Sequence, residues 1–102
     1  MKIERWDPKR DGPFSEAQLR KKIEKRGYRV TRYTYPPGTY FPDHTHTIDK
    51  IDAVVSGRFR MTTPKGEAIL ERGDMLAVPH GTVHSAEVVG TEAVVSLDAT
   101  KA

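Results

Sequence analysis

The sequence GTYFPDHTHTIDKIDAVVSG occupies residues 38–57, and a second glycine-bounded segment, GDMLAVPHGTVHSAEV, occupies residues 73–88. Successive side chains of an extended strand alternate between its two faces, so we expect His44 and His46 to project from one face about 7 Å apart. At that separation both imidazoles can bind one ion. The second segment adds a third imidazole, His84, after a Pro-x-Gly-x-x-His turn. Neutral imidazole is the commonest transition-metal ligand in proteins, and three of them leave coordination positions open.

The spacing of residues in these two segments resembles the two motifs of the cupin family. The first motif runs Gly, five residues, His-x-His, three or four residues, Glu, six residues, Gly. The second runs Gly, five residues, Pro-x-Gly, two residues, His, three residues, Asn. The matching positions are Gly38, His44, His46, Gly57, Gly73, Pro79, Gly81 and His84. The resemblance is tight over residues 38–88 and loose in the flanks, and it implies that the three histidines are metal ligands.

The sequence departs from the cupin pattern at two positions, because Lys50 stands where the family places its ligand Glu and Val88 stands where it places Asn. A lysine ammonium has three donors and no acceptor, so it cannot bind a metal unless it is deprotonated. We rank first a site of three histidines alone, as in the thiol-dioxygenase branch that this arrangement resembles. Asp52, which shares strand parity with His44 and His46, or Asp49, brought into register by a bulge, could supply a fourth ligand.

No positioned general acid or base is evident in the sequence, and Tyr40 and Lys50 are the nearest candidates for a catalytic role. Lys50 could anchor a substrate carboxylate or lower the affinity for a metal. A salt bridge between Lys50 and Asp49 or Asp52 is the structural alternative. His80 occupies the variable position of the Pro-x-Gly turn, and we expect it to be a loop residue.

The length and composition predict one folded domain. A chain of 102 residues with 36% apolar and 30% charged residues has room for a single core that buries roughly two-thirds of the surface of the unfolded chain. We expect an N-terminal arm and helix over residues 1–27 and a β-barrel over residues 28–98. The absence of cysteine excludes disulfides and thiolate ligands. With no signal-peptide core and no apolar run of about 18 residues, a cytoplasmic location and no membrane partner are expected.

The net charge of +3 and the isoelectric point near 9.3 raise the question of an anionic partner. The basic excess falls mainly within residues 20–32, which we interpret as one exposed helix and the following strand. That segment lacks the interleaved aromatic residues of a base-stacking surface. We therefore predict no nucleic-acid partner and interpret the charge as a solvated surface.

One helix is predicted near the N-terminus. Ser15 and Gln18 form a Ser-x-x-Gln capping box, Phe14 and Leu19 occupy the positions of a hydrophobic staple, and Gly27 is suited to end the helix. Before this helix, residues 3–6 are predicted to form an edge strand, and Pro and Gly residues indicate turns over residues 7–13.

From residue 28 onward the sequence predicts only strands. Segments rich in β-branched and aromatic residues alternate with turn residues. The expected strands cover residues 28–35, 50–55, 58–63, 67–70, 75–78, 83–89 and 92–97. Such short, regularly spaced strands predict an all-β sandwich or barrel. The resemblance implies the double-stranded β-helix, or jelly-roll, barrel with one short N-terminal α-helix.

The resemblance also implies a metal-binding protein that acts on a small organic molecule. Iron would favour oxygenase-type chemistry, whereas Mn, Ni or Zn would favour Lewis-acid reactions such as isomerisation or elimination. The alternative is a non-catalytic module that binds or senses a small ligand. An unpaired sheet edge is commonly covered by another subunit, so we expect a homodimer that uses residues 3–6 or 28–35.

Overall fold

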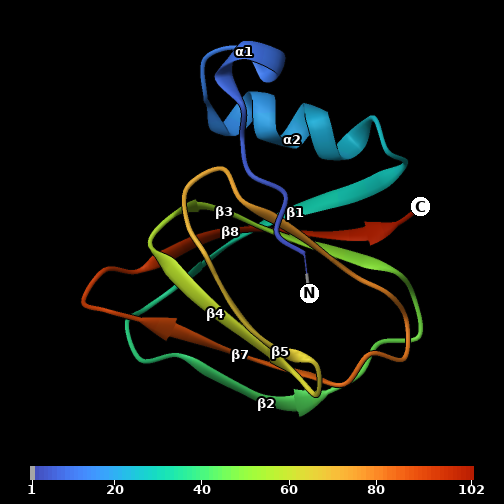
Figure 1. Cartoon of the computed structure of the whole chain (residues 1–102), viewed down its shortest axis with the longest axis vertical. Coiled ribbons are helices and arrows are strands. Elements are labelled where there is room, and N and C mark those ends of the chain that lie inside the picture. The colour runs from blue at the N-terminus through green and yellow to red at the C-terminus, as the bar shows by residue number, and fades with distance from the viewer. Residues whose placement is uncertain (1) are drawn as a thin grey trace.

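The structure, a computed structural model, describes residues 2–102, in which two antiparallel sheets face each other and two helices lie outside one of them (Figure 1). The helices are α1 (Pro8–Asp11) and α2 (Glu16–Glu24). The strands are β1 (Tyr28–Tyr35), β2 (Tyr40–His44), β3 (Lys50–Ser56), β4 (Arg58–Thr63), β5 (Gly66–Leu70), β6 (Met75–Val78), β7 (His84–Val89) and β8 (Val94–Lys101). The all-β class is thus confirmed.

The strand order is β1-β8-β3-β6 in the first sheet and β2-β7-β4-β5 in the second. Every connection between consecutive strands passes from one sheet to the other, except the β4–β5 hairpin. This arrangement is consistent with a jelly roll. The strand ladders of residues 2–102 form two separate sheets, so the predicted jelly-roll barrel is not closed by hydrogen bonds between them. A chain that changes sheets at nearly every turn can enclose a core between two layers without joining their edges.

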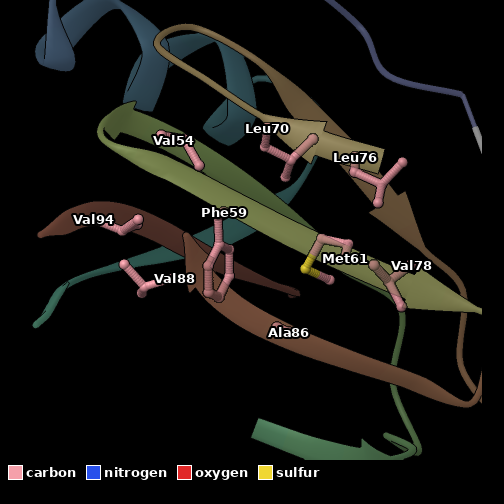
Figure 2. Close-up of a cluster of buried hydrophobic side chains, with 9 residues drawn as sticks. All are labelled: Val54, Phe59, Met61, Leu70, Leu76, Val78, Ala86, Val88 and Val94. Atoms are coloured by element: carbon pink, nitrogen blue, oxygen red, sulfur yellow. The ribbon is translucent and has the colours of Figure 1, made fainter. Parts of the chain in front are cut away.

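The main core lies between the two sheets and is drawn in Figure 2, where apolar side chains from both layers point toward one another. Its buried members are Val54, Phe59, Met61, Leu70, Leu76, Val78, Ala86, Val88 and Val94. Alternation along each strand places every second side chain in this space. Val88, at the position where cupins carry Asn, is therefore a core residue.

A second core fills the space between α2 and the outer face of the first sheet. Leu19 and Ile23 of α2 are fully buried against Ile51 and Ala53 of β3 and Leu97 of β8. Both faces of β3 are consequently covered, one by α2 and one by the second sheet. Side chains of β3 that point inward, including its charged ones, are thus held in a largely enclosed space.

The helix α2 begins as the sequence predicts, because the Ser15 hydroxyl accepts a hydrogen bond of 3.1 Å from the Gln18 amide. The single turn of α1 was not expected, since residues 7–13 were predicted to form turns only. Asp7 caps it by accepting from the Lys9 amide, and Pro8 stands in its first turn. Neither helix within residues 2–102 is long and apolar enough to cross a membrane.

The N-terminal segment does not form the predicted edge strand over residues 3–6. It makes one isolated bridge to β6, in which Glu4 and Met75 exchange backbone hydrogen bonds of 2.9 Å. Arg5 adds an ion pair of 2.7 Å to Asp74. Ile3 packs against the main core and Trp6 against the buried side chains between α2 and the first sheet. Side-chain contacts and ion pairs, rather than a strand ladder, therefore hold this segment.

Candidate metal centre

Three histidines meet where β2 and β7 lie side by side. His44 ends β2 and faces His84, the first residue of β7, in the strand register. The ring centroids of His44 and His84 are 4.2 Å apart, and those of His46 lie 4.9 Å and 5.1 Å from them. One nitrogen from each ring lies within 4.8 Å of the others. The sequence prediction that these residues converge is therefore matched by the geometry.

The route to this geometry differs from the one expected. The strand ends at His44, and an irregularity between Phe41 and His44 shifts its register, so His46 lies in the following loop rather than on the strand. Simple alternation over His44 and His46 was therefore the wrong reason for their proximity. A hydrogen bond of 2.8 Å from the Gly81 amide to the His46 carbonyl holds this loop in position.

Backbone carbonyls orient two of the three rings. Nδ1 of His44 lies 2.7 Å from the Pro42 carbonyl oxygen, and Nδ1 of His84 lies 2.9 Å from that of Thr82. A carbonyl can only accept, so Nδ1 carries the proton in both rings when they are neutral. The lone pair on Nε2 is then free, which is the state a histidine needs to bind a metal.

The surroundings favour neutral imidazoles. Burial lowers the pKa of His46, and the positive charge of Lys50 lowers it further. Burial likewise lowers the pKa of His84, although the hydrogen bond to Thr82 acts in the opposite direction. Protons therefore compete less well for these nitrogens than for an exposed histidine.

The three rings form one wall of a cavity of about 160 Å³ between the sheets. Its apolar lining comes from Phe41, Phe59, Met61 and Ala86, and Figure 2 shows the last three among the side chains of the main core. This volume is below the 300 Å³ or so typical of pockets for drug-sized ligands. The cavity can hold a small organic molecule together with a few waters.

The opposite wall carries charge. Lys50 and Asp52 of β3 and Asp98 of β8 line the same cavity, with Tyr35 beside them. Nζ of Lys50 lies 2.7 Å from Oδ1 and 2.9 Å from Oδ2 of Asp98. The partner of Lys50 is thus Asp98, whereas the salt bridge considered from the sequence involved Asp49 or Asp52.

Neither candidate fourth ligand belongs to the histidine group. Within residues 2–102, the one cluster of three or more donor side chains is His44, His46 and His84. Asp49 instead accepts from the His80 amide at 2.9 Å and lies 2.8 Å from Nδ1 of His80. This pair joins the loop after His46 to the loop before His84. Asp52 lies opposite Asp98 in the ladder between β3 and β8.

The two catalytic candidates lie in different places. Lys50 lines the cavity, as described, and its side chain is only 11% exposed. Tyr40 lies on β2 with 59% of its surface exposed and is not part of the cavity lining. An acid or base at the site is therefore better sought among the residues of the charged wall than at Tyr40.

The family follows from comparison with known proteins. A family model described as the cupin domain matches residues 31–100, which is more than half of the chain. The chain belongs to the cupin family. Its separate sheets and its histidine cluster occupy the matched region, whereas α1 and α2 precede it.

This cupin is similar to several known proteins. It is 38% identical over 63 residues to a gentisate 1,2-dioxygenase from a Ralstonia species, a match that covers 61% of this chain and 18% of that protein. A cupin domain from Bordetella pertussis shares 26% identity at a TM-score of 0.57, covering 74% of this chain and 82% of the other. The lyase DddQ from Ruegeria pomeroyi, which acts on DMSP, gives a TM-score of 0.66 at 19% identity over 74% of this chain and 39% of that one.

These similarities differ in how much they show about this chain. The last structure, below 25% identity, shows the fold alone. The chain spans 18% of the length of the dioxygenase, which is less than one-fifth of it.

Asp98, which lines the cavity, was not among the site residues predicted from the sequence. The predicted strand over residues 92–97 ended one residue before Asp98, whereas β8 continues to Lys101 and gives Asp98 the strand parity of the buried Val94 and Ser96. An acidic residue in register with a buried face is rarely found without a partner. The partner itself could not be named, since the pairing of β3 with β8 joins residues 48 positions apart.

Proposed function

We propose that this cupin binds one divalent transition-metal ion through His44, His46 and His84 and acts on a small organic molecule held in the adjoining cavity. The observation that carries the proposal is the convergence of three ring nitrogens within 4.8 Å at the wall of that cavity. Neutral imidazoles suit Fe, Ni, Cu and Zn, and three of them leave positions for water or substrate. The bound metal would supply Lewis acidity or, if it is iron, redox chemistry.

The protein's own residues have definable tasks. Hydrogen bonds to the carbonyls of Pro42 and Thr82 hold the rings of His44 and His84 with Nε2 available. Phe41 and Phe59 pack edge to face at 6.3 Å and restrict the space beside the rings. The small volume then favours a compact ligand, and the apolar side excludes most water from it.

Oxygenase-type chemistry with iron is the first reaction class to test. The proposal is supported by the similarity to gentisate 1,2-dioxygenase and by a histidine cluster that includes no carboxylate. Isomerisation or elimination with Mn, Ni or Zn is the second class, for which the DMSP lyase offers a likeness of fold.

The deciding experiment is metal analysis followed by oxygen uptake. We expect about one ion per chain. Loss of a residue that only supports a metal ligand typically weakens binding about 10 to 100-fold, so we expect His44→Ala, which removes a ligand, to weaken it at least that much. The matched control is His80→Ala, because His80 lies on the neighbouring loop outside the cluster. Equal metal content in both variants and the parent protein would overturn the site. Oxygen uptake by the iron-loaded protein with gentisate, absent in His44→Ala, would support the oxygenase class.

A non-catalytic binding module is the second candidate. Its support is the Lys50–Asp98 ion pair, which fills the cavity wall where a fourth metal ligand would stand in the cupin pattern. A binder would show ligand-dependent thermal stabilisation with no consumption of the ligand. Loss of substrate over time in the metal-loaded protein would exclude that reading.

A further inference from the structure

The inward face of the first sheet carries charge where a two-layer sandwich normally carries apolar residues. Val54 on β3 and Val94 on β8 point into the main core and are fully buried. Farther along the same faces stand Lys50 and Asp52 on β3 and Asp98 on β8, all lining the histidine cavity. Replacing such buried charges by apolar residues is often neutral or stabilising. Their presence therefore indicates a role in the cavity rather than in folding.

The charges in this group do not balance. Asp52 and Asp98 are directly opposed across the β3–β8 ladder, and like charges in opposed positions are unfavourable. Lys50 neutralises one carboxylate, since Nζ lies 2.7 Å from Asp98 Oδ1. Two carboxylates and one ammonium would leave a net negative charge in an enclosed space. One proton on the pair removes it.

Asp52 shares the cavity with titratable or charged side chains from several elements. Lys50 comes from β3 itself, Asp98 from β8 and Tyr35 from β1, while the residue opposite Asp52 on β6 is the apolar Leu76. The second sheet and the loop after β2 present the imidazoles of His44, His46 and His84. The titratable and charged residues of the cavity are thus Tyr35, His44, His46, Lys50, His84 and Asp98.

We propose that Asp52 and Asp98 share one proton and act as the proton-exchanging partner of whatever is bound at the three-histidine wall of the same cavity. The proton exchange rests on the proposed function, whereas the shared proton is argued from the opposed positions of the two carboxyls on β3 and β8 and from the cavity that both line.

The direction of the pKa agrees with this geometry. Burial, with the nearby charge of Asp98 adding to it, raises the pKa of Asp52 to about 7, against the opposing effect of Lys50. Desolvation also raises the pKa of Tyr35 to about 12. The carboxyl pair is therefore the group of this wall that can both give and take a proton near neutral pH.

The exchange is a simple proton transfer. When an acidic hydroxyl of the bound molecule loses its proton to ionised Asp52, one O–H bond breaks in that molecule and one forms on the carboxyl. The ligand oxygen gains one negative charge, and Asp52 loses one. In the reverse direction protonated Asp52 returns the proton to that oxygen. No other reactant is needed.

The shared proton is tested first, in metal-free protein, by following the side-chain carboxyl carbons by NMR during a pH titration. We expect Asp52 to titrate near pH 7 and to move to lower pH in Asp98→Asn, because that variant removes the opposed negative charge. An Asp52 carboxyl that titrates near pH 4 in the parent protein, or that does not respond to Asp98→Asn, would overturn the shared proton.

The exchange is tested with Zn²⁺ alone as the probe, by calorimetry at pH 6 in buffers of different ionisation enthalpy. A divalent charge within about 10 Å lowers a carboxyl pKa by roughly two units at an effective dielectric constant of about 20. Zinc binding should therefore release about one proton more from the parent protein than from Asp52→Asn. Protons lost by the histidines are common to both proteins and cancel.

Asp49→Asn is the matched control, because Asp49 bonds to His80 and does not line the cavity. It should release as many protons as the parent protein. Equal release from the parent protein and Asp52→Asn would overturn the exchange while leaving the metal site intact. If the parent protein binds no zinc, the proposed function and the exchange both fail, and the carboxyl titration still decides whether the proton is shared. Folding of each variant is checked by circular dichroism.

Discussion

Nζ of Lys50 and Oδ1 of Asp98 lie 2.7 Å apart within the protein, with side chains that are only 11% and 22% exposed. Removing one partner of a buried pair leaves an uncompensated charge and typically costs about 3 to 5 kcal/mol. We expect Lys50→Met, which keeps the length of the side chain, to lower the free energy of unfolding by about 3 kcal/mol. Urea denaturation at pH 7 measures it.

Arg58→Met is the matched control for that loss. Arg58 pairs with Glu71 at 3.4 Å, and both side chains are more than half exposed. Such surface pairs contribute about 1 kcal/mol or less. Equal losses in the two variants would mean that the Lys50 pair is screened by water and is not the enclosed interaction described above.

Lys50 also bears on metal affinity, because its positive charge lines the histidine cavity. Lys50→Glu replaces that charge with a carboxylate at the position of the fourth ligand in the cupin pattern. We expect Zn²⁺ binding to tighten in Lys50→Glu and, to a smaller extent, in Lys50→Met, although both proteins should be less stable than the parent. Competition with a chromogenic chelator gives the affinities. Weaker binding in Lys50→Glu would show that the side chain at this position does not reach the metal.

The pH dependence of zinc binding should separate the imidazoles from the carboxyl pair. Burial lowers the pKa of His46 and of His84, so their neutral forms persist to lower pH than usual and affinity is lost as pH falls through those lowered values. In Asp52→Asn we expect the affinity to hold to lower pH than an ordinary histidine would allow, and to fall only as these two imidazoles become protonated. In the parent protein the decline should begin near pH 7, where burial places the pKa of Asp52. Binding that is unchanged at pH 5 would contradict imidazole ligation.

Gly57 is the single residue between β3 and β4, where the chain passes from one sheet to the other. Its φ is +84°, and a Cβ there would lie 2.4 Å from the Ala93 carbonyl oxygen. Gly38 has a similar φ of +81° but open space around it. We expect Gly38→Ala to cost about 1 to 2 kcal/mol from the backbone alone, and Gly57→Ala to cost at least about 3 kcal/mol. Equal midpoints of thermal denaturation for Gly38→Ala and Gly57→Ala would show that the contact with the Ala93 carbonyl adds no cost.

Of the two interfaces predicted for the homodimer, the structure favours β1. Residues 3–6 contact β6 of their own chain through the Glu4–Met75 bridge. Among residues 2–102, β1 pairs with one strand only, β8, so its other edge has no neighbouring strand. The Val30 carbonyl of β1 accepts a hydrogen bond of 3.1 Å from the Arg20 guanidinium. We therefore predict a two-fold dimer through β1. Light scattering at high micromolar concentration should give twice the mass of the chain, and a monomer mass would refute the prediction.

The local sequence was sufficient for the features that depend on short spacings. The capping box at Ser15 and Gln18 depends on residues three positions apart, and its hydrogen bond forms as predicted. The histidine motifs likewise place their imidazoles by turns and strand ends, since His84 follows Gly81 within one turn. His46 lies beside the other two rings as expected, but strand parity was the wrong reason, because β2 ends at His44.

The charged wall of the cavity was decided by tertiary structure. Lys50, Asp52 and Asp98 come together only because β8 inserts between β1 and β3 in a register that sets Asp52 against Asp98. That register is determined by burying Leu97 and Ala99 against α2 on the opposite face, and a slip of one residue would reverse every side chain of the strand. Since the pairing of Lys50 with Asp98 spans 48 positions, local spacing contains no information about it. The sequence alone thus indicates three histidines for a metal, whereas packing of both faces of one sheet places a proton-holding carboxyl pair opposite them.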